Sequence, residues 1–207
     1  MKFLRMVCSV IMLLVVLSGC SEASSEKSGV LTVKPFELFE GDAKRYQPFL
    51  GSMSGAVKLN YKGTKSNVRV SMEVWENGAL KEPEQSSLSS ALQQSQNGDR
   101  VMDGELVVSV KQQTDEITPK KTKYNVTVAL NDQGGTSSTE YEVTADIAVS
   151  SSMPIVLGNN ELVIDEAEEA AVWGMQASEN GMQTVSFTQE MLKDVKWAIV
   201  FKISLSD

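Results

Sequence analysis

The residue with the most clearly defined chemistry is Cys20, which closes the run Leu17, Ser18, Gly19, Cys20. A cysteine thiol is the most nucleophilic side chain that the chain offers for alkylation. The small residues Ser18 and Gly19 would let a protease approach the backbone just before it. These features suit Cys20 to covalent modification and the bond before it to cleavage.

The segment before Cys20 has the composition of a secretory signal peptide. It begins with the basic residues Lys2 and Arg5, contains no acidic residue, and continues as the apolar run Met6–Leu17. As a helix this run would span about 18 Å, whereas the hydrocarbon core of a bilayer is about 30 Å thick. The length therefore predicts a cleaved signal peptide over residues 1–19 rather than a membrane-spanning anchor.

Together, Leu17, Ser18, Gly19 and Cys20 resemble the lipobox of bacterial lipoproteins. The resemblance covers the signal segment only. It implies that the Cys20 thiol receives a diacylglycerol, that the Gly19–Cys20 bond is cut, and that the mature chain begins at Cys20. Two acyl chains give a stable anchor, where one gives only marginal binding. We therefore expect a lipid-anchored protein on the extracytoplasmic side of the cell membrane. Ser21 does not resemble the aspartate retention signal of Gram-negative lipoproteins, so the type of envelope stays open.

The chain that follows the signal is acidic and has no second cysteine. Two of the 19 basic residues and none of the 27 acidic ones precede Cys20, so the remainder carries a net charge of −10. This charge disfavours nucleic acid and anionic lipid headgroups as partners. With Cys8 in the signal, no disulfide can form within the remainder, and a hydrophobic core must stabilise the fold.

The chain contains no histidine. This removes histidine-dependent nucleophile pairs and general bases, together with ordinary zinc and copper sites. No glycine-rich phosphate loop is present either. We therefore predict a protein that is not an enzyme, with no catalytic residue, no metal and no cofactor.

One acidic run, Asp165, Glu166, Glu168 and Glu169, could in principle bind calcium or supply a catalytic carboxylate pair. It lacks the glycine and the alternating Asp/Asn of a calcium loop. Hydrolytic carboxylates also need a defined separation across a cleft, which adjacent residues rarely provide. We expect either a solvated connector or the acidic first turn of a helix. The Asn131–Gly135 stretch is similarly typical of a hairpin turn rather than a cation site.

The three tryptophans are the remaining candidates for a binding site, because their rings can stack on sugars. Trp197 shares a face with Ile199 and Phe201 and is expected in the core. Trp75 lies on the face opposite Val74 and is expected to be partly exposed. Trp173 precedes a glycine and could lie at a rim. Packing is the expected role of each, and Trp75 and Trp173 are weak candidates for ligand binding.

Apolar residues recur with a period of two in many segments, which predicts strands of antiparallel sheets with one buried face. The clearest are 57–61, 68–74, 106–110, 124–130, 141–149 and 197–205. We expect an all-β fold, an immunoglobulin-like or related antiparallel β-sandwich, with a sheet closed into a barrel as the alternative. Hairpins are predicted between 57–61 and 68–74, between 124–130 and 141–149, and around Asn180-Gly181.

Few helices are expected, at most one or two short ones. Thr188 could cap a helix through Lys193, and 165–171 could begin another. Residues 86–96 are expected to form a loop with at most one helical turn. We expect residues 20–29 to be a flexible polar tether and residues 30–207 to form a single β-sandwich domain.

These features favour a membrane-anchored, non-catalytic interaction or binding module. Its expected partners are the membrane, through the lipid on Cys20, and an envelope protein or a small ligand. A small-ligand or carbohydrate receptor using Trp75 or Trp173 is the alternative. A hydrolase that works with carboxylates alone is a weaker one.

Overall fold

The computed structural model describes residues 28–51, 53–113, 121–158 and 160–207. The predicted signal peptide, its cleavage site at Gly19 and Cys20, and the tether up to residue 27 lie outside these residues.

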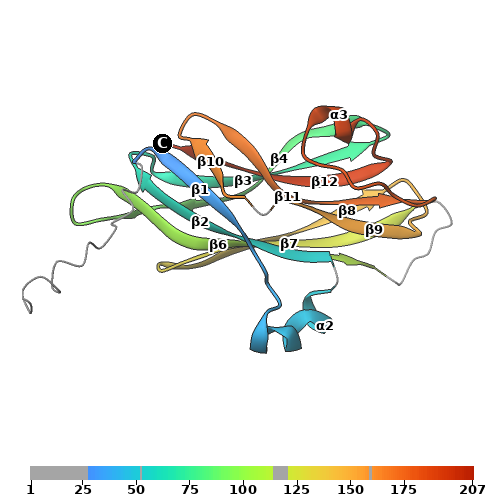
Figure 1. The fold of residues 1–207 in the computed structure, drawn as a ribbon, viewed down its shortest axis with the longest axis horizontal. Coiled ribbons are helices and arrows are strands. Elements are labelled where there is room, and N and C mark those ends of the chain that lie inside the picture. Colours follow the sequence, from blue (N-terminus) through green and yellow to red (C-terminus); the bar gives the residue numbers. More distant parts are fainter. Residues whose placement is uncertain (1–27, 52, 114–120, 159) are drawn as a thin grey trace, which may run out of the picture.

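Two antiparallel sheets packed face to face make up the described part of the chain (Figure 1). The first has seven strands, six of which follow the order β10-β1-β2-β6-β7-β8, and β5 pairs with β6. The second has five strands in the order β4-β3-β12-β11-β9. The predicted all-β antiparallel sandwich is therefore confirmed. Among the described residues the two sheets are separate and do not close into a barrel. The bounds in the first sheet are β10 (Leu162–Asp165), β1 (Val30–Phe36), β2 (Met53–Gly63), β6 (Arg100–Gln112), β7 (Thr122–Asp132), β8 (Gly135–Ala145) and β5 (Gln93–Gln94); in the second they are β4 (Ala79–Ala91), β3 (Asn67–Glu76), β12 (Trp197–Ser206), β11 (Glu169–Ser178) and β9 (Ser151–Val156).

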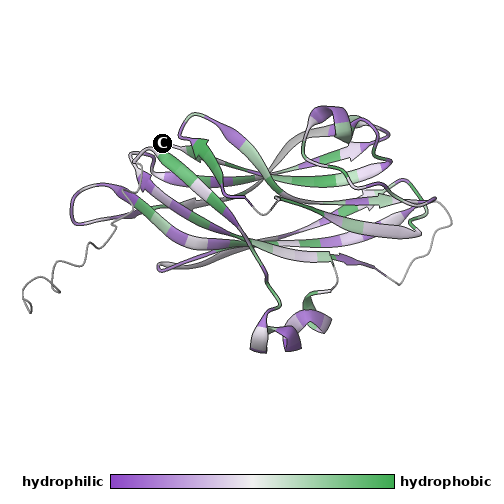
Figure 2. Cartoon of the chain, viewed as in Figure 1, coloured by the Kyte–Doolittle hydropathy of each residue, from purple (hydrophilic) through white to green (hydrophobic). Residues whose placement is uncertain are grey.

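The main core lies between the sheets and is built from the residues that alternate along the strands. Figure 2 shows the bands of hydrophobic and hydrophilic residues that this alternation produces. Val33, Leu59 and Val128 of the first sheet are buried in one cluster with Ile199 and Phe201 of the second. Because successive side chains of a strand point to opposite faces, the alternation places one apolar face of each sheet against the other.

A second, smaller core covers the outer face of the five-stranded sheet. It contains Trp75, Leu192, Val195 and Val200, and the helix α3 (Gln189–Leu192) lies over this face (Figure 1). The predicted cap is confirmed, since the Thr188 side chain accepts a hydrogen bond from the amide of Met191. Residues 197–201 of β12 are buried without interruption, because this strand has apolar neighbours on both faces.

One long loop leaves the sandwich between β1 and β2. It contains a short 3-10 helix, η1 (Gly41–Tyr46), and the helix α2 (Gln47–Leu50), and it projects away from both layers (Figure 1). Neither β1 nor this loop was expected from the sequence. The loop begins where β1 and β2 still pair, at Phe36 opposite Ala56, so it is a long insertion in a hairpin.

Two of the three predicted hairpins are wrong. The β7–β8 hairpin is confirmed, with Asp132 opposite Gly135. β2 and β3, however, belong to different sheets, because the 64–66 link carries the chain across the sandwich. Around Asn180-Gly181 the chain leaves β11 and folds over the outer face of the sheet instead of returning as a paired strand.

Two further expectations about local structure are also wrong. Much of the predicted loop 86–96 is strand, in β4 and β5, even though its apolar residues are few. Pairing with β3 and β6 sets the conformation here more than intrinsic preference does. The helix expected over 165–171 is absent, because this segment ends β10, turns, and begins β11.

Candidate functional site

The acidic run forms the connection between β10 and β11 and thus passes from one sheet to the other. Asp165 ends β10 and Glu169 begins β11, and the Glu168 amide donates to the Asp165 carbonyl at 2.9 Å. The expectation of a connector is confirmed, and that of a helical first turn is wrong. The side chains of this run do not converge on one point, since Glu166 and Glu169 have separate sets of partners.

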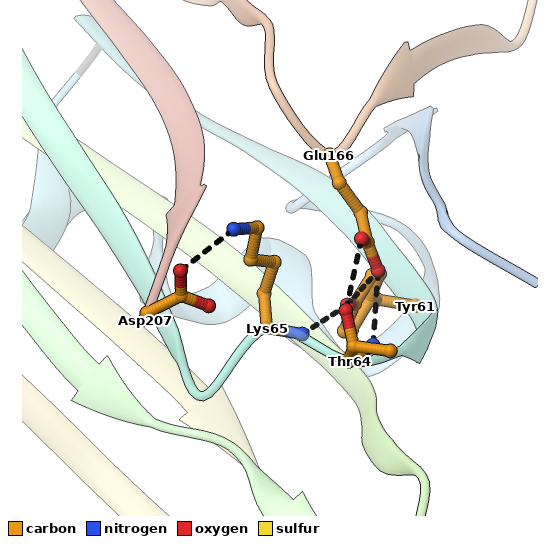
Figure 3. A network of polar contacts seen from close by, with 5 residues as sticks. All are labelled: Tyr61, Thr64, Lys65, Glu166 and Asp207. Carbon is orange, nitrogen blue, oxygen red and sulfur yellow. Dashed lines mark hydrogen bonds and ion pairs between the residues drawn. The ribbon is translucent and has the colours of Figure 1, made fainter.

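Glu166 fastens the β10–β11 connection to the link between β2 and β3 (Figure 3). Its Oε1 accepts hydrogen bonds from the Tyr61 hydroxyl at 2.5 Å and the Thr64 amide at 3.0 Å, and Oε2 accepts from Thr64 Oγ1 at 3.1 Å. The Lys65 amide donates to the Tyr61 hydroxyl at 2.8 Å. The Tyr61 and Thr64 hydrogen bonds hold the pKa of Glu166 below its ordinary value. Burial, and then the bond to Glu166, raise the pKa of Tyr61 to about 12.

Glu169 lies in a different network on the outer face of the five-stranded sheet. It accepts from Ser71 Oγ at 2.9 Å and lies 3.6 Å from Lys202 Nζ. Lys202 also pairs with Glu73. In the part of the chain that the structure describes, no group of three or more Asp, Glu, His or Cys residues is placed to hold a metal ion. The carboxylates thus make contacts typical of ion pairs and capped turns.

All three tryptophans are enclosed by packing, and neither Trp197 nor Trp75 lines the surface hollow that includes Trp173. Trp197 is fully buried and stacks on Tyr124 with ring centroids 5.1 Å apart, as predicted for a core residue. Trp75 is only 9% exposed, and its Nε1 donates to Glu73 Oε2 at 3.0 Å. The expected partial exposure of Trp75 is wrong, because the segment that contains Leu192 and Val195 packs over it.

Trp173 also packs into the main core, but it lines a surface hollow as well. It is 2% exposed, and its ring lies 6.0 Å from that of Phe201. A register shift between Ala171 and Trp173 places both Val172 and Trp173 in the main core. Its Nε1 lies so close to β2 that a Cβ added to Gly55 would be 2.0 Å away. Gly55 therefore lets the indole approach the opposite sheet.

The hollow lies at the root of the β1–β2 loop and has a volume of about 380 Å³. The hollow is open at an edge of the sandwich. Among the described residues β9 is the last strand of its sheet, and β10 pairs only with Val30–Val33 of β1, so that no strand pairs with the outer side of β1 beyond Val33. Its lining is mainly aromatic and aliphatic, and the polar side chains in it are those of Glu37 and Ser54. The residues are Pro35, Phe36, Glu37, Leu38, Phe39, Ser54, Gly55, Ala56, Val57, Pro154, Val156, Leu157, Val172 and Trp173.

The lining presents mainly apolar surface and few titratable side chains. No lysine or arginine lines the hollow, and Glu37 is its one carboxylate. A general acid–base mechanism needs positioned titratable groups, which this lining does not offer in pairs.

Trp173 could be singled out from the sequence by its residue type, whereas the residues of the other wall of the hollow were not expected there. Phe36, Leu38 and Phe39 carry a signal, since three large apolar residues stand within four positions, between and beside glutamates. Val156 carries no such signal in the sequence, and its exposure of 57% on an edge strand is visible only in the structure.

No helix among the described residues is both long and apolar enough to cross a bilayer. Comparison of the chain with protein families, with curated proteins and with solved structures found no match.

Proposed function

We propose that this chain is a lipid-tethered, non-catalytic binding module on the extracytoplasmic side of the cell membrane. The hollow beside Trp173 is its ligand site and takes an apolar part of the ligand. The observation that carries this proposal is the hollow itself, an apolar concavity at the root of a long loop. Ligand sites are typically concave, mostly apolar and about 300–1,000 Å³ in volume, and long loops are often functional.

The lining favours an uncharged or singly cationic apolar group over a sugar or an anion. A sugar site needs several polar side chains to satisfy the hydroxyls, and here Glu37 and Ser54 are the polar ones. Ser54 already donates to the Leu50 carbonyl at 2.8 Å. In the lining itself an anion would meet the Glu37 carboxylate and no cation, because Lys58 lies outside it, over the Phe36 ring with its Nζ 4.8 Å from the centroid. The carbohydrate receptor is therefore the second candidate, and the observation that favours it is that Trp173 lines the hollow, although only 2% of the residue is exposed.

The tether is supported by the sequence before the described residues. Leu17, Ser18, Gly19 and Cys20 resemble a lipobox, and a short polar segment follows. A tethered module needs no metal or catalytic pair. The hydrolase alternative has less support, because Glu166 and Glu169 are engaged in separate networks.

A titration with an uncharged apolar fluorophore, N-phenylnaphthylamine, tests the ligand site. We expect saturable binding by the full chain. The Val156→Glu variant should weaken binding roughly tenfold or more, because it places a charge at the rim of an apolar site. Val163→Glu is the matched control, since Val163 is 50% exposed on β10 and does not line the hollow.

Equal affinity of the two variants for the dye would contradict the proposed site. A panel of neutral and amino sugars, followed by thermal shift, tests the second candidate. Sugars that stabilise the protein and displace the dye would replace the apolar-ligand proposal with a carbohydrate receptor.

A further inference from the structure

The η1–α2 loop presents two aromatic side chains to solvent. Phe49 is 72% exposed and Tyr46 is 51% exposed, although both are large apolar rings. Neither belongs to the main core or to the smaller outer core. The segment that carries them projects from the sandwich (Figure 1). We call these two side chains the aromatic tip.

The loop is held in place at its base, so the aromatic tip is a structured feature. The Leu50 carbonyl, at the end of α2, accepts hydrogen bonds from Ser54 Oγ at 2.8 Å and from Ser109 Oγ at 2.7 Å. These bonds attach α2 to β2 and β6. The Arg45 guanidinium lies over the Tyr46 ring, 5.0 Å from its centroid.

We propose that the aromatic tip inserts into the headgroup region of the bilayer to which the chain is tethered. The inference rests on the proposed lipid anchor at Cys20, because the anchor brings the sandwich to the membrane. The Tyr46 ring combines an apolar body with a polar end, which favours this region, and the Phe49 ring supplies apolar surface that can be buried there. Basic residues next to such rings favour this region too. Lys44, Arg45 and Tyr46 are consecutive, and Phe49 follows one helical turn later.

The length of chain between Cys20 and the sandwich permits this contact. Extended, the chain from Cys20 to Ser28 spans at most about 28 Å. The strand β1, which runs from the tether to the loop, is about 20 Å long. The aromatic tip lies beyond the far end of β1, so the anchor and the tip can lie on the same membrane surface when β1 is inclined toward that surface.

Charge indicates which bilayer and which driving force to expect. The loop contains three acidic residues, Glu37, Glu40 and Asp42, besides Lys44 and Arg45. Attraction to anionic lipid is therefore not the driving force. The driving force that we expect is burial of the two rings in the headgroup region of a zwitterionic bilayer.

Quenching of a new tryptophan by brominated lipid tests the proposal. Native Trp75, Trp173 and Trp197 are at most 9% exposed, so they give a shielded background. Phe49→Trp and Tyr46→Trp place an indole at the aromatic tip. Because both native side chains are exposed, we expect these substitutions to leave the fold intact. Val163→Trp is the matched control, on a strand outside the loop.

Each full-length protein is isolated from membranes, its acylation is read by mass spectrometry, and it is reconstituted into vesicles of acyl-brominated phosphatidylcholine. We expect emission loss for Phe49→Trp and Tyr46→Trp, and none for Val163→Trp or the unsubstituted chain. An acylated protein whose tip variants are not quenched would overturn the inference and leave the proposed function standing. A chain without acyl groups would overturn both. Quenching of Val163→Trp to the same extent as the tip variants would also overturn the inference. So would tip-variant emission that shifts with protein concentration in the absence of lipid, because that shift would indicate contact between copies of the chain.

Discussion

At the scale of single residues, Glu166 shows how one carboxylate fastens two of the connections that pass between the sheets. It lies on the β10–β11 connection and accepts hydrogen bonds from Tyr61 and Thr64, at the end of β2 and just after it. Gly63 makes room for this contact, because a Cβ there would lie 2.2 Å from Glu166 Oε1 and 2.4 Å from the Tyr61 hydroxyl oxygen. The acidic run was a candidate site in the sequence, whereas the contacts of Glu166 are those of a residue that stabilises the fold.

The contribution of Glu166 to stability should depend on pH. Its pKa in the folded protein is lower than the ordinary value of 4.5, because Tyr61 and Thr64 donate hydrogen bonds to it. Such a group stabilises the fold fully above its unfolded pKa, and the stabilisation is lost as the pH falls through the lower, folded pKa. At pH 7, Glu166→Gln should lower the free energy of unfolding by about 1 kcal/mol, and the difference should shrink below about pH 4.

Urea unfolding at pH 7 and pH 3 measures this. Glu168→Gln is the control on the same turn, since Glu168 is exposed; we expect a change within about 0.5 kcal/mol at both pH values. A Glu166→Gln effect of the same size at both pH values would contradict the role of the charged carboxylate.

At the scale of elements, β2 and β11 approach each other closely where Gly55 faces Trp173. Gly55→Ala would put its Cβ 2.0 Å from Trp173 Nε1, so the indole must shift and the wall of the hollow with it. Overpacking of this kind costs about 1–3 kcal/mol of unfolding free energy. We also expect a shift in tryptophan emission. Gly158→Ala is the control, because no atom lies within 4 Å of its added Cβ; unfolding midpoints that match for the two variants would contradict the close approach.

The element α3 matters because it closes the smaller core over Trp75. Leu192→Ala should lower the free energy of unfolding by about 2–3 kcal/mol, since Leu192 is buried in this core and its truncation leaves a cavity. Met191→Ala, one residue earlier and exposed, should change it by less than about 0.5 kcal/mol. Denaturant unfolding of both variants, followed by tryptophan fluorescence, measures the difference. Two equal losses would mean that α3 does not cover the sheet as described.

The same elements explain what the sequence could and could not predict. Alternation along β7, β8 and β12 identified a buried face, and hence strands and a sandwich. Alternation does not identify the neighbouring strand, so β2 and β3 were paired wrongly although they lie in different sheets. The five consecutive apolar residues 197–201 were a signal that β12 is covered on both faces.

The candidate site was harder to predict because it is made by tertiary structure. Trp173 could be singled out by type, but its place at the hollow depends on the register shift in β11. Phe36 and Val156 reach the same hollow from two other strands that sequence spacing does not bring together.

At the scale of the whole molecule, the proposed anchor, the hollow and the aromatic tip are arranged along β1 and its loop. β1 begins next to the tether and ends at Phe36, which lines the hollow. The aromatic tip follows in the same loop. Membrane attachment and ligand binding would therefore use one segment of the chain, while the opposite edge of the sandwich, formed by β4 and β8, is left for other contacts.

Removal of the anchor should change the location of this molecule without changing its fold. Cys20→Ser removes the thiol that the lipobox resemblance assigns to lipid, whereas the described cores are composed of residues from Leu31 onward. We expect the variant to move from the membrane fraction to the soluble fraction, with the urea midpoint unchanged. Cys8→Ser is the matched control and should stay in the membrane fraction, because Cys8 lies inside the apolar run without small residues before it. If processed Cys20→Ser protein stayed as firmly membrane-bound as the control, something other than lipid on Cys20 would have to hold the chain there.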